Sequence, residues 1–374
     1  MTNNRYIPLD ILRGIAILNM LFVDAPPDFD NLYSIFVHSP WEGITIADLA
    51  FPGFVFVMGA SLVFARKNKK RLRTSIWLKK ICKRTAVLFF IGIIFNAFPA
   101  ILHFFISQSM NFSSFLGALF NNIRIMGVLQ RLALVYFFSS LIIRFLNEKY
   151  LLLTAFCLLF ISSIFTHIYS PTAPFLQDNN LNIYIDLLVL GENHILSNNP
   201  LYEPEGIFGT ITSISSMIFG FYAAKLLMQK NYRGIVFFGS FTVFAGGIWS
   251  VFDIISKPLW SVPYALFTTG FFVFLFLIVE LLYNKFGEKN HIFLPFASFG
   301  QNPIFFYLAT NFMLIVLNSI YFTNGNSIYF SLYQLSVKGI VSDAFSSALF
   351  AFMWCLLWLP IAIYLYKKNI TIRI

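Results

Sequence analysis

A histidine and an aspartate lie ten residues apart in the segment HSPWEGITIADLAFPGFVFVMGASL. His38 is in a polar, aromatic stretch, and Asp48 stands at the start of a long apolar run. A neutral imidazole can take a proton from a nucleophile and return it to a leaving group, or can itself be acylated. A carboxylate inside an apolar span is costly unless it is paired or functional. Asp48 could therefore orient the imidazole or bind an amine, and the alternative is a structural loop whose histidine is simply hydrogen-bonded.

Two arginines accompany another apolar run, in NNIRIMGVLQRLALVYF. Arg124 lies near the start of the run, and Arg131 lies about two helical turns deeper, beside Gln130. Because a lipid-facing arginine is expensive, we expect Arg131 to face the interior of the protein. Its planar guanidinium suits a phosphate or a carboxylate. The alternative role is a structural ion pair with Asp10 or Asp48.

Two pairs of charged residues border other apolar runs. Glu203 and Glu205 stand just before one run, where they could bind a cationic sugar amine or stabilise the N-terminus of a helix. Asp253 and Lys257 are four residues apart at the end of another run, and we expect them to form a local ion pair.

A helix break is predicted at the GQNP sequence, residues 300–303. Backbone that is not helical within a membrane is tolerated where it lines a cavity, and amide side chains suit such a lining. The amides of Gln301, Asn302 and Asn311 are the candidates for this role.

Composition identifies the class of protein that must position these side chains. Hydrophobic residues make up 58% of the 374 and charged residues 11%, and the mean hydropathy is +0.74, so the apolar surface exceeds what one soluble core could bury. A spanning helix needs about 20 apolar residues. The sequence therefore predicts an all-α, polytopic integral membrane helix bundle, with about ten transmembrane helices in one domain over residues 1–374. The predicted spans are 7–24, 45–65, 84–105, 125–144, 150–169, 207–228, 234–253, 262–283, 292–317 and 343–366.

The distribution of positive charge predicts the orientation of the bundle. Residues 66–84 hold ten of the 26 Lys and Arg residues, and the positive-inside rule places this segment in the cytoplasm, together with both chain termini. The loop of His38 then faces away from the cytoplasm, as does the acidic segment 170–206, which has no Lys or Arg. The basic segment could contact anionic lipid or attract a polyanionic cytoplasmic cofactor.

Other kinds of site have no signature in the sequence. Cys82, Cys157 and Cys355 share no metal-ligand spacing, so we expect neither a metal site nor a disulfide framework. No nucleic-acid-binding module or Gly-rich phosphate loop is present. The first span is followed by no small-residue cleavage site, so a removable signal peptide is not expected.

Six segments, in order from Leu9 to Tyr307, resemble the heparan-α-glucosaminide N-acetyltransferase family and its bacterial relatives. They are LDILRG, HSPWEGITIADLAFPGFVFVMGASL, RIMGVLQRLAL, YEPEGIFGTI, KPLWSVPYALFTTG and FGQNPIFFY. The H-x-x-W-x-G-x-T-x-A-D-L block is the most specific of them. Compared with the animal enzyme, the chain is expected to lack an N-terminal luminal domain, which fits a bacterial member.

The resemblance implies that an acetyl group moves from cytoplasmic acetyl-CoA to the amine of a terminal glucosamine on the far side of the membrane. The family's active histidine maps onto His38 and the carboxylate of its block onto Asp48. Asp24 stands where the family commonly has asparagine, so it is included among the expected catalytic residues and leaves the identity of the acceptor open. His38 could deprotonate the acceptor amine or carry the acetyl group itself.

Acetyl-CoA is the expected co-substrate, and no metal is expected. Polar side chains near the arginine-bearing run and the helix break are the expected acetyl-CoA contacts: Arg124, Gln130, Arg131 and Asn302. Loop residues are the expected contacts of the amino-sugar acceptor: Trp41, Glu203 and Glu205. The resemblance further suggests a homodimer in a bacterial inner membrane. Two alternatives remain open, a transporter of amino sugars or muropeptide fragments and an O-acyltransferase that acts on envelope glycans.

Overall fold

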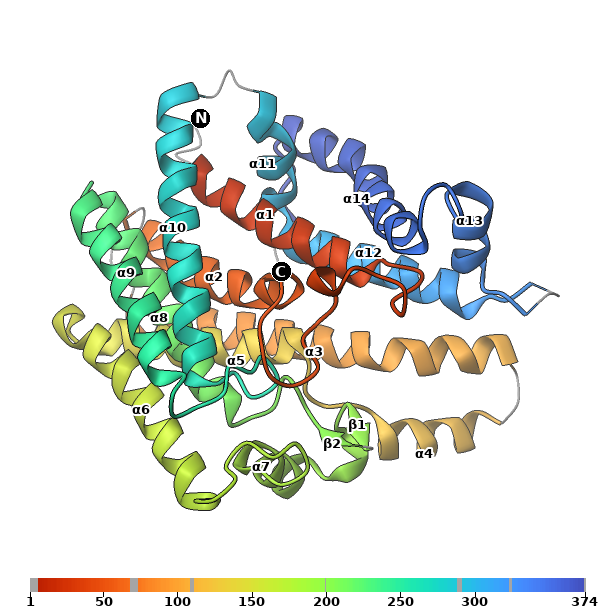
Figure 1. Cartoon of the computed structure of the whole chain (residues 1–374), viewed down its shortest axis with the longest axis horizontal. Coiled ribbons are helices and arrows are strands. Elements are labelled where there is room, and N and C mark those ends of the chain that lie inside the picture. The colour runs from red at the N-terminus through yellow and green to blue at the C-terminus, as the bar shows by residue number, and fades with distance from the viewer. Residues whose placement is uncertain are drawn as a thin grey trace.

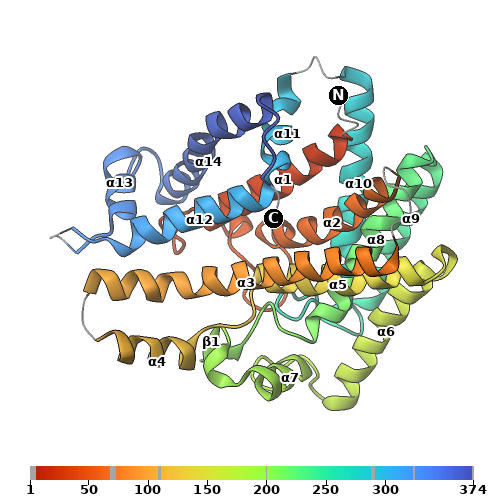
Figure 2. The same cartoon turned by 180° about the vertical axis from the view of Figure 1, so that it is seen from behind.

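Every predicted span coincides with a helix in the computed structural model, which describes residues 6–67, 73–107, 111–198, 200–287, 291–322 and 325–372. The long helices lie side by side as one bundle (Figures 1 and 2). These helices are α1 (Ile7–Asp24), α2 (Ala50–Lys67), α3 (Thr74–Ser107), α5 (Val128–Phe145), α6 (Leu151–Tyr169), α8 (Gly209–Met228), α9 (Tyr232–Trp249), α10 (Val262–Phe286), the pair α11 (Leu294–Gln301) and α12 (Pro303–Ser319), and α14 (Asp343–Lys367).

By length and composition, fewer than ten helices in the described part of the chain qualify as membrane spans. Among the described residues, seven helices are long and apolar enough, and an eighth is gained if the bent pair α11–α12 is one span. Helix α1 falls outside this set and carries three charged residues, Asp10, Arg13 and Asp24, in its 18 positions. The chain is thus an all-α, polytopic membrane helix bundle, but the predicted count of ten spans is not confirmed.

Short elements that the sequence reading did not anticipate lie between the long helices. Helices α4 (Phe112–Asn122), α7 (Leu181–Leu190) and α13 (Ile328–Ser336) each begin after a capping side chain, because Asn111, Asn180 and Ser327 accept a hydrogen bond from a backbone N–H three residues ahead. Strands β1 (Ser197–Asn198) and β2 (Leu201–Tyr202) form a small antiparallel hairpin. The described residues also include five single 3-10 turns: η1 (Ser34–Phe36), η2 (Ala47–Leu49), η3 (Glu148–Tyr150), η4 (Glu192–His194) and η5 (His291–Phe293).

The basic segment 66–84 is largely helical rather than a loop. Helix α3 begins at Thr74, so Lys79, Lys80, Lys83 and Arg84 lie on it. Basic residues 69–71 of the same segment lie outside the described residues.

Glycines allow two pairs of helices to pack with their backbones in contact. A Cβ atom on Gly59 of α2 or on Gly220 of α8 would collide with a backbone carbonyl of the other helix. Gly14 of α1 and Gly300 of α11 stand in the same reciprocal relation. Small residues at helix crossings are a common means of association in membranes, where apolar burial gives little driving force. These crossings fix α1 and α2, whose facing ends border the His38 loop.

Candidate active site

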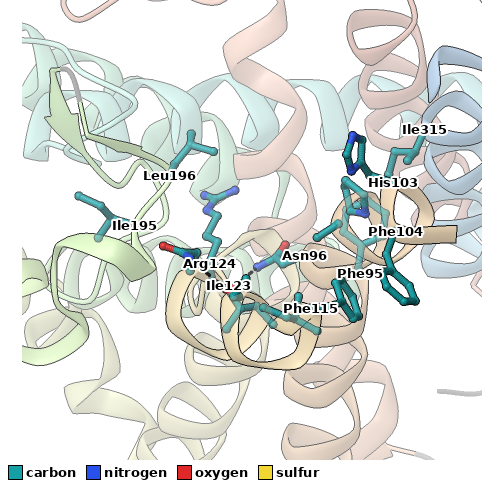
Figure 3. Close-up of a pocket in the computed structure, with 15 residues that line it drawn as sticks. Phe95, Asn96, His103, Phe104, Phe115, Ile123, Arg124, Ile195, Leu196 and Ile315 are labelled. Atoms are coloured by element: carbon teal, nitrogen blue, oxygen red, sulfur yellow. Dashed lines mark hydrogen bonds between the residues drawn. The ribbon is translucent and has the colours of Figure 1, made fainter. Parts of the chain in front are cut away.

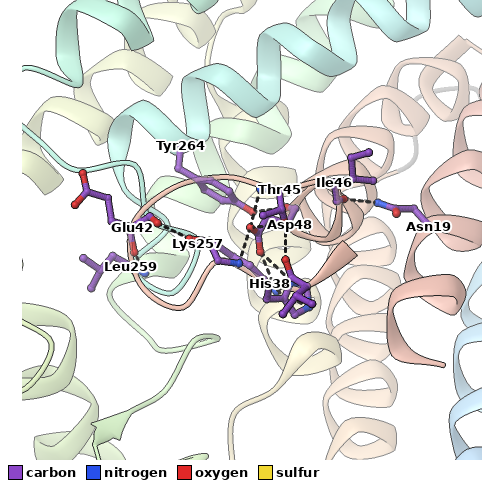
Figure 4. A network of polar contacts seen from close by, with 12 residues as sticks. Asn19, His38, Glu42, Thr45, Ile46, Asp48, Lys257, Leu259 and Tyr264 are labelled. Carbon is purple, nitrogen blue, oxygen red and sulfur yellow. Dashed lines mark hydrogen bonds and ion pairs between the residues drawn. The ribbon is translucent and has the colours of Figure 1, made fainter. Parts of the chain in front are cut away.

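His38 and Asp48 meet at the entrance to α2. The His38 side chain lies in the loop between η1 and η2, and its Nδ1 is 2.9 Å from Asp48 Oδ1 (Figure 4). The Asp48 side chain is fully buried, whereas the His38 side chain is 45% exposed. Because an ionised carboxylate only accepts hydrogen bonds, this contact places the imidazole proton on Nδ1 and leaves Nε2 as the basic nitrogen. The structure therefore brings together the two residues whose meeting the sequence left open.

Asp48 is held by backbone and side-chain donors from its own loop. Its Oδ2 accepts hydrogen bonds from Ser39 N (3.2 Å), Thr45 N (3.0 Å) and Thr45 Oγ1 (3.1 Å). The hydroxyl of Tyr264, on α10, donates to the Asp48 carbonyl at 2.7 Å. A buried carboxylate needs such partners to offset its desolvation. This set of bonds fixes the direction in which Asp48 faces His38.

Lys257 is a third member of the site that the sequence reading assigned elsewhere. Its Nζ lies 3.1 Å from His38 Nδ1, 3.2 Å from His38 Nε2 and 3.8 Å from Asp48 Oδ1 (Figure 4). The expected ion pair between Lys257 and Asp253 is wrong, since the two residues lie in a turn-rich connection rather than on one helical face and point to different partners. Burial lowers the pKa of Lys257, and the carboxylates of Glu205, Asp48 and Asp24 act against that shift.

The connection from α9 to α10, residues 250–261, positions Lys257 through several backbone contacts. The Ile255 carbonyl accepts a hydrogen bond from Gly43 N of the His38 loop at 2.7 Å. Asn182 donates to the Leu259 carbonyl at 3.2 Å, and Thr212 donates to the Trp260 carbonyl at 2.7 Å. The connection is thus attached both to the His38 loop and to the neighbouring helices.

Two other expected residues lie near this centre. Asp24, at the end of α1, accepts a hydrogen bond from Asn311 Nδ2 at 3.3 Å and interacts electrostatically with His38 and Lys257. The indole of Trp41 donates to the Phe175 carbonyl at 2.8 Å and packs edge-on against Tyr202. Trp41 therefore links the His38 loop to the segments that follow α6 and α7.

Glu203 and Glu205 both bind Arg124 and do not cap α8 by a side-chain hydrogen bond. Arg124 Nε donates to Glu203 Oε2 at 2.9 Å, and its Nη2 contacts Glu205 Oε2 at 2.6 Å as well as Glu203 Oε1. Burial raises the pKa of Glu203 despite the arginine. Burial also acts to raise the pKa of Glu205, but Arg124, Arg131 and Lys257 outweigh it and lower that pKa. Arg124 is thus committed to two carboxylates.

Arg131 is buried on α5, as expected, but its partner is not a carboxylate. Its Nη2 donates to the Gly206 carbonyl at 2.9 Å, and its guanidinium lies 5.2 Å from the ring centre of Trp260. Within the described ranges Arg131 forms no salt bridge with Asp10, which binds Arg13, or with Asp48. Its Nε and Nη1 have no hydrogen-bond partner among the described residues, and neither has Nε2 of the neighbouring Gln130. Buried donors of this kind are unusual and can serve a ligand.

Asn302 lies at the break between α11 and α12, where the two axes differ by 78°. Its Nδ2 donates to the Ile370 carbonyl, as does Gln301 Nε2, and its Oδ1 accepts from Ile372 N, at 2.8–2.9 Å. The break predicted from the sequence is confirmed, and the amide of Asn302 holds the segment that follows α14.

A cavity of about 540 Å³ opens beside Arg124, between α3, α4 and α12 (Figure 3). Its lining is mostly apolar and includes Phe95, Phe104 and Phe115, and Asn96 and His103 are among its polar residues. His38, Asp48 and Lys257 are not part of this lining.

Comparison with known proteins gives the family. The sequence profile described as heparan-alpha-glucosaminide N-acetyltransferase, catalytic, matches residues 5–198, which is more than half of the 374 residues. A human protein named heparan-alpha-glucosaminide N-acetyltransferase is 28% identical over an alignment that covers 80% of this chain and 52% of that protein. A mouse protein of the same name is 27% identical over an alignment that covers 82% of this chain and 53% of that protein. The chain spans about half the length of the curated relatives it matches. The matched profile includes His38 and Asp48, and the chain belongs to the heparan-α-glucosaminide N-acetyltransferase family.

Proposed function

We propose that this protein is a transmembrane N-acetyltransferase that moves the acetyl group of acetyl-CoA to the amine of a glucosamine-type sugar. The observation that carries the proposal is the contact between His38 Nδ1 and the buried carboxylate of Asp48, 2.9 Å long, in a chain of this family. A carboxylate that fixes the tautomer of a histidine and stabilises its charged form is a recurring arrangement in acyl transfer.

His38 Nε2 is the reacting nitrogen in this mechanism. In one route Nε2 takes a proton from the acceptor amine as the amine attacks the thioester carbonyl; the C–S bond breaks, and the imidazolium returns the proton to the CoA thiolate. In the other route Nε2 attacks the thioester and CoA thiolate leaves; the amine then displaces the imidazole from the acetyl group, and the proton that the amine loses passes to the freed Nε2 and from there to the thiolate. Both routes need the Nδ1 proton held by Asp48, since either one places positive charge on the ring.

Arg131 and Gln130 are the best-suited contacts for acetyl-CoA. Their donor atoms Arg131 Nε and Nη1 and Gln130 Nε2 are buried without hydrogen-bond partners in the described part of the chain, so they fit the carbonyl or phosphate oxygens of such a molecule. The expected donors of Arg124 and Asn302 are engaged with Glu203, Glu205 and the segment after α14. Acetyl-CoA would supply the activated thioester, and the protein's own residues would orient it.

Three carboxylates around Lys257 form the region to which we assign the acceptor amine. Asp24, Asp48 and Glu205 all interact electrostatically with Lys257, so three carboxylates are available to attract an acceptor amine. Trp41, whose indole N–H is held by the Phe175 carbonyl, is the aromatic residue of the His38 loop that we assign to the sugar ring. The orientation inferred from Lys and Arg, with both termini in the cytoplasm of a bacterium and His38 on the far side of its inner membrane, remains part of the proposal, as does a homodimer.

An acceptor panel tests the function. Purified protein in detergent or vesicles is given acetyl-CoA with a radiolabelled acetyl group and glucosamine, chitosaccharides or sugars that have only hydroxyls. Labelled product from the amino sugars alone is expected. Labelled product from hydroxyl-only sugars would instead indicate an O-acyltransferase, and uptake of amino sugar into vesicles without acetyl-CoA would indicate a transporter.

A further inference from the structure

Acyl transfer at His38 also requires a hydrogen-bond donor to the oxygen of the thioester. The thioester oxygen gains negative charge when its carbonyl carbon becomes tetrahedral, and enzymes place hydrogen-bond donors at that position in advance. The described hydrogen bonds of Arg131 and Asn302 lead to Gly206 and Ile370 and not to His38. Lys257 Nζ, in contrast, lies 3.1 and 3.2 Å from the two ring nitrogens of His38.

The two distances fix the side from which Lys257 approaches. The nitrogens of an imidazole flank the Cε1 atom, so an in-plane atom equally close to both would collide with Cε1. Lys257 Nζ therefore lies over the face of the ring. The in-plane direction of Nδ1 is taken by Asp48 at 2.9 Å. Among the described residues Nε2 has no hydrogen-bond contact besides Lys257 Nζ, so its in-plane direction is the one assigned to the acetyl group or the acceptor amine. A tetrahedral carbon at Nε2 projects its substituents above and below the ring plane, and so toward Nζ on one side.

We propose that Lys257 is a catalytic residue whose ammonium donates a hydrogen bond to the oxyanion of the tetrahedral intermediate formed beside His38. This inference rests on the proposed acetyl transfer. No proton leaves Lys257 in this step: the oxygen gains charge as the new bond to carbon forms, and returns to a carbonyl as the C–S or C–N(imidazole) bond breaks.

Three carboxylates around Lys257 favour its ammonium form and act against the burial that lowers its pKa. Asp48 Oδ1 is 3.8 Å away, and Asp24 and Glu205 also act on it electrostatically, whereas Arg131 opposes them. The Lys257 side chain is only 16% exposed. A donor fixed before the reaction and shielded from water is worth more than a mobile one, because little reorganisation is needed at the transition state.

The test removes the amine of the Lys257 side chain by mutation and then restores an amine chemically at the same position. In a background with Cys82, Cys157 and Cys355 replaced by alanine, Lys257→Cys is compared before and after alkylation with 2-bromoethylamine, which converts the thiol to a side chain that ends in an ammonium. Lys257→Met and Lys257→Arg are the matched variants. Each is measured for kcat and for the KM of acetyl-CoA, with glucosamine as acceptor, and alkylation is checked by mass spectrometry.

We expect Lys257→Met and unmodified Lys257→Cys to lose about 10²–10³-fold in kcat, with KM for acetyl-CoA changed much less. Alkylation of Lys257→Cys should recover at least about a tenth of the wild-type kcat, which a purely structural role would not produce. The inference is overturned if Lys257→Met keeps kcat within about threefold of wild type, or if the fully alkylated protein stays inactive. If Lys257→Met does not fold, the cysteine variant before and after alkylation gives the same comparison. Wild-type protein that transfers no acetyl group would overturn the proposed function, and this inference with it.

Discussion

Two histidine–aspartate pairs in this protein have nearly the same geometry and different surroundings. His38 and Asp48 are 2.9 Å apart, as are His167 and Asp253. In both pairs the aspartate is buried, and the histidine side chain is 45% exposed in the first and 39% in the second. The first pair uses His38 Nδ1 and the second uses His167 Nε2.

The partners of the two aspartates differ. Asp48 faces backbone N–H groups and the Lys257 ammonium, whereas Asp253 accepts hydrogen bonds from Ser163 Oγ at 3.0 Å and from Trp249 Nε1 at 3.1 Å. Within the described residues no lysine or arginine contacts the second pair. Both aspartates are well satisfied, so a histidine–aspartate contact does not by itself mark a reaction centre. We infer that the second pair anchors the start of the 250–261 connection, which carries Lys257 to the first.

Replacement of each aspartate by asparagine should separate the two pairs most strongly. Asp48→Asn can present its amide NH₂ to His38 Nδ1, which would favour the tautomer protonated at Nε2 and remove the basic nitrogen, so kcat should fall about 10²–10⁴-fold. Asp253→Asn should lower it by less than about tenfold, through displacement of the Lys257 connection. Steady-state transfer to glucosamine measures both. Equal losses in the two variants would remove the functional distinction.

A third arrangement, the two glutamates on Arg124, should be the most costly for stability. Arg124→Gln leaves the buried carboxylates of Glu203 and Glu205 without a cation. Removing one partner of a buried ion pair typically costs about 3–5 kcal/mol, so the detergent-solubilised variant should unfold at a clearly lower temperature. Arg124→Lys keeps a single charge and should lie between it and wild type. Unchanged thermal unfolding in Arg124→Gln would show that these acids are not structural.

A buried carboxylate with neither histidine nor lysine beside it should respond to pH. Burial raises the pKa of Asp186 to about 7, against a hydrogen bond from Ile207 N and the charge of Arg131. The unfolded chain releases this proton near pH 3.8. Between the two values the folded protein alone holds the proton, so stability should fall as pH rises, by about 1.4 kcal/mol per pH unit, until the pH passes the folded pKa.

Asp186→Asn is the matched control for that dependence, because it cannot titrate. Unfolding temperatures of wild type and variant are measured from about pH 5 to about pH 8, a range that includes the titration of Asp186 in the folded protein. The two sets of temperatures should diverge as pH rises, with the variant more stable at the alkaline end. Parallel curves would contradict the assignment.

Trp41 provides the smallest of these effects and tests whether the two pairs are coupled. Its indole binds the Phe175 carbonyl, and the Phe175 ring packs edge-on against His167. Trp41→Phe should cost about 1 kcal/mol of stability through the lost hydrogen bond. A double-mutant cycle with His167→Ala then measures the coupling in unfolding free energy. A coupling well above about 0.5 kcal/mol is expected for residues that share a partner, and strict additivity would mean that the pairs act independently.

Local patterns in the sequence predicted the helices well. Long apolar runs locate the spanning helices because a helix in lipid must satisfy its own backbone groups. The break at Asn302 followed from Gly300 and Pro303. The count of ten spans is not confirmed, because α1, with three charged residues in its 18 positions, is a helix of the bundle but falls outside the set that is apolar enough to span a membrane. Short capped helices such as α7 were missed because they bury little apolar surface of their own.

Contacts between distant residues explain why the site was only partly predicted. His38 and Asp48 were found through their chemistry and the family resemblance, and only the fold could show that they touch. Asp253 and Lys257 were paired because charges four apart meet on a helix, but here they lie beyond the end of α9 and reach different partners. The KPLW segment, which begins with Lys257 and belongs to the family pattern, was the signal that could have assigned Lys257 to the site.

The most direct test of the central claim, that His38 carries acetyl transfer, is the rate of label transfer from acetyl-CoA to glucosamine by His38→Ala and His167→Ala proteins. Both variants are first shown to retain wild-type size-exclusion behaviour and thermal stability, and the two histidines serve as each other's control. His38→Ala should fall to the uncatalysed background, a loss of at least about 10²-fold, while His167→Ala keeps about a tenth or more of the wild-type rate. Turnover by His38→Ala within about tenfold of wild type would contradict the claim.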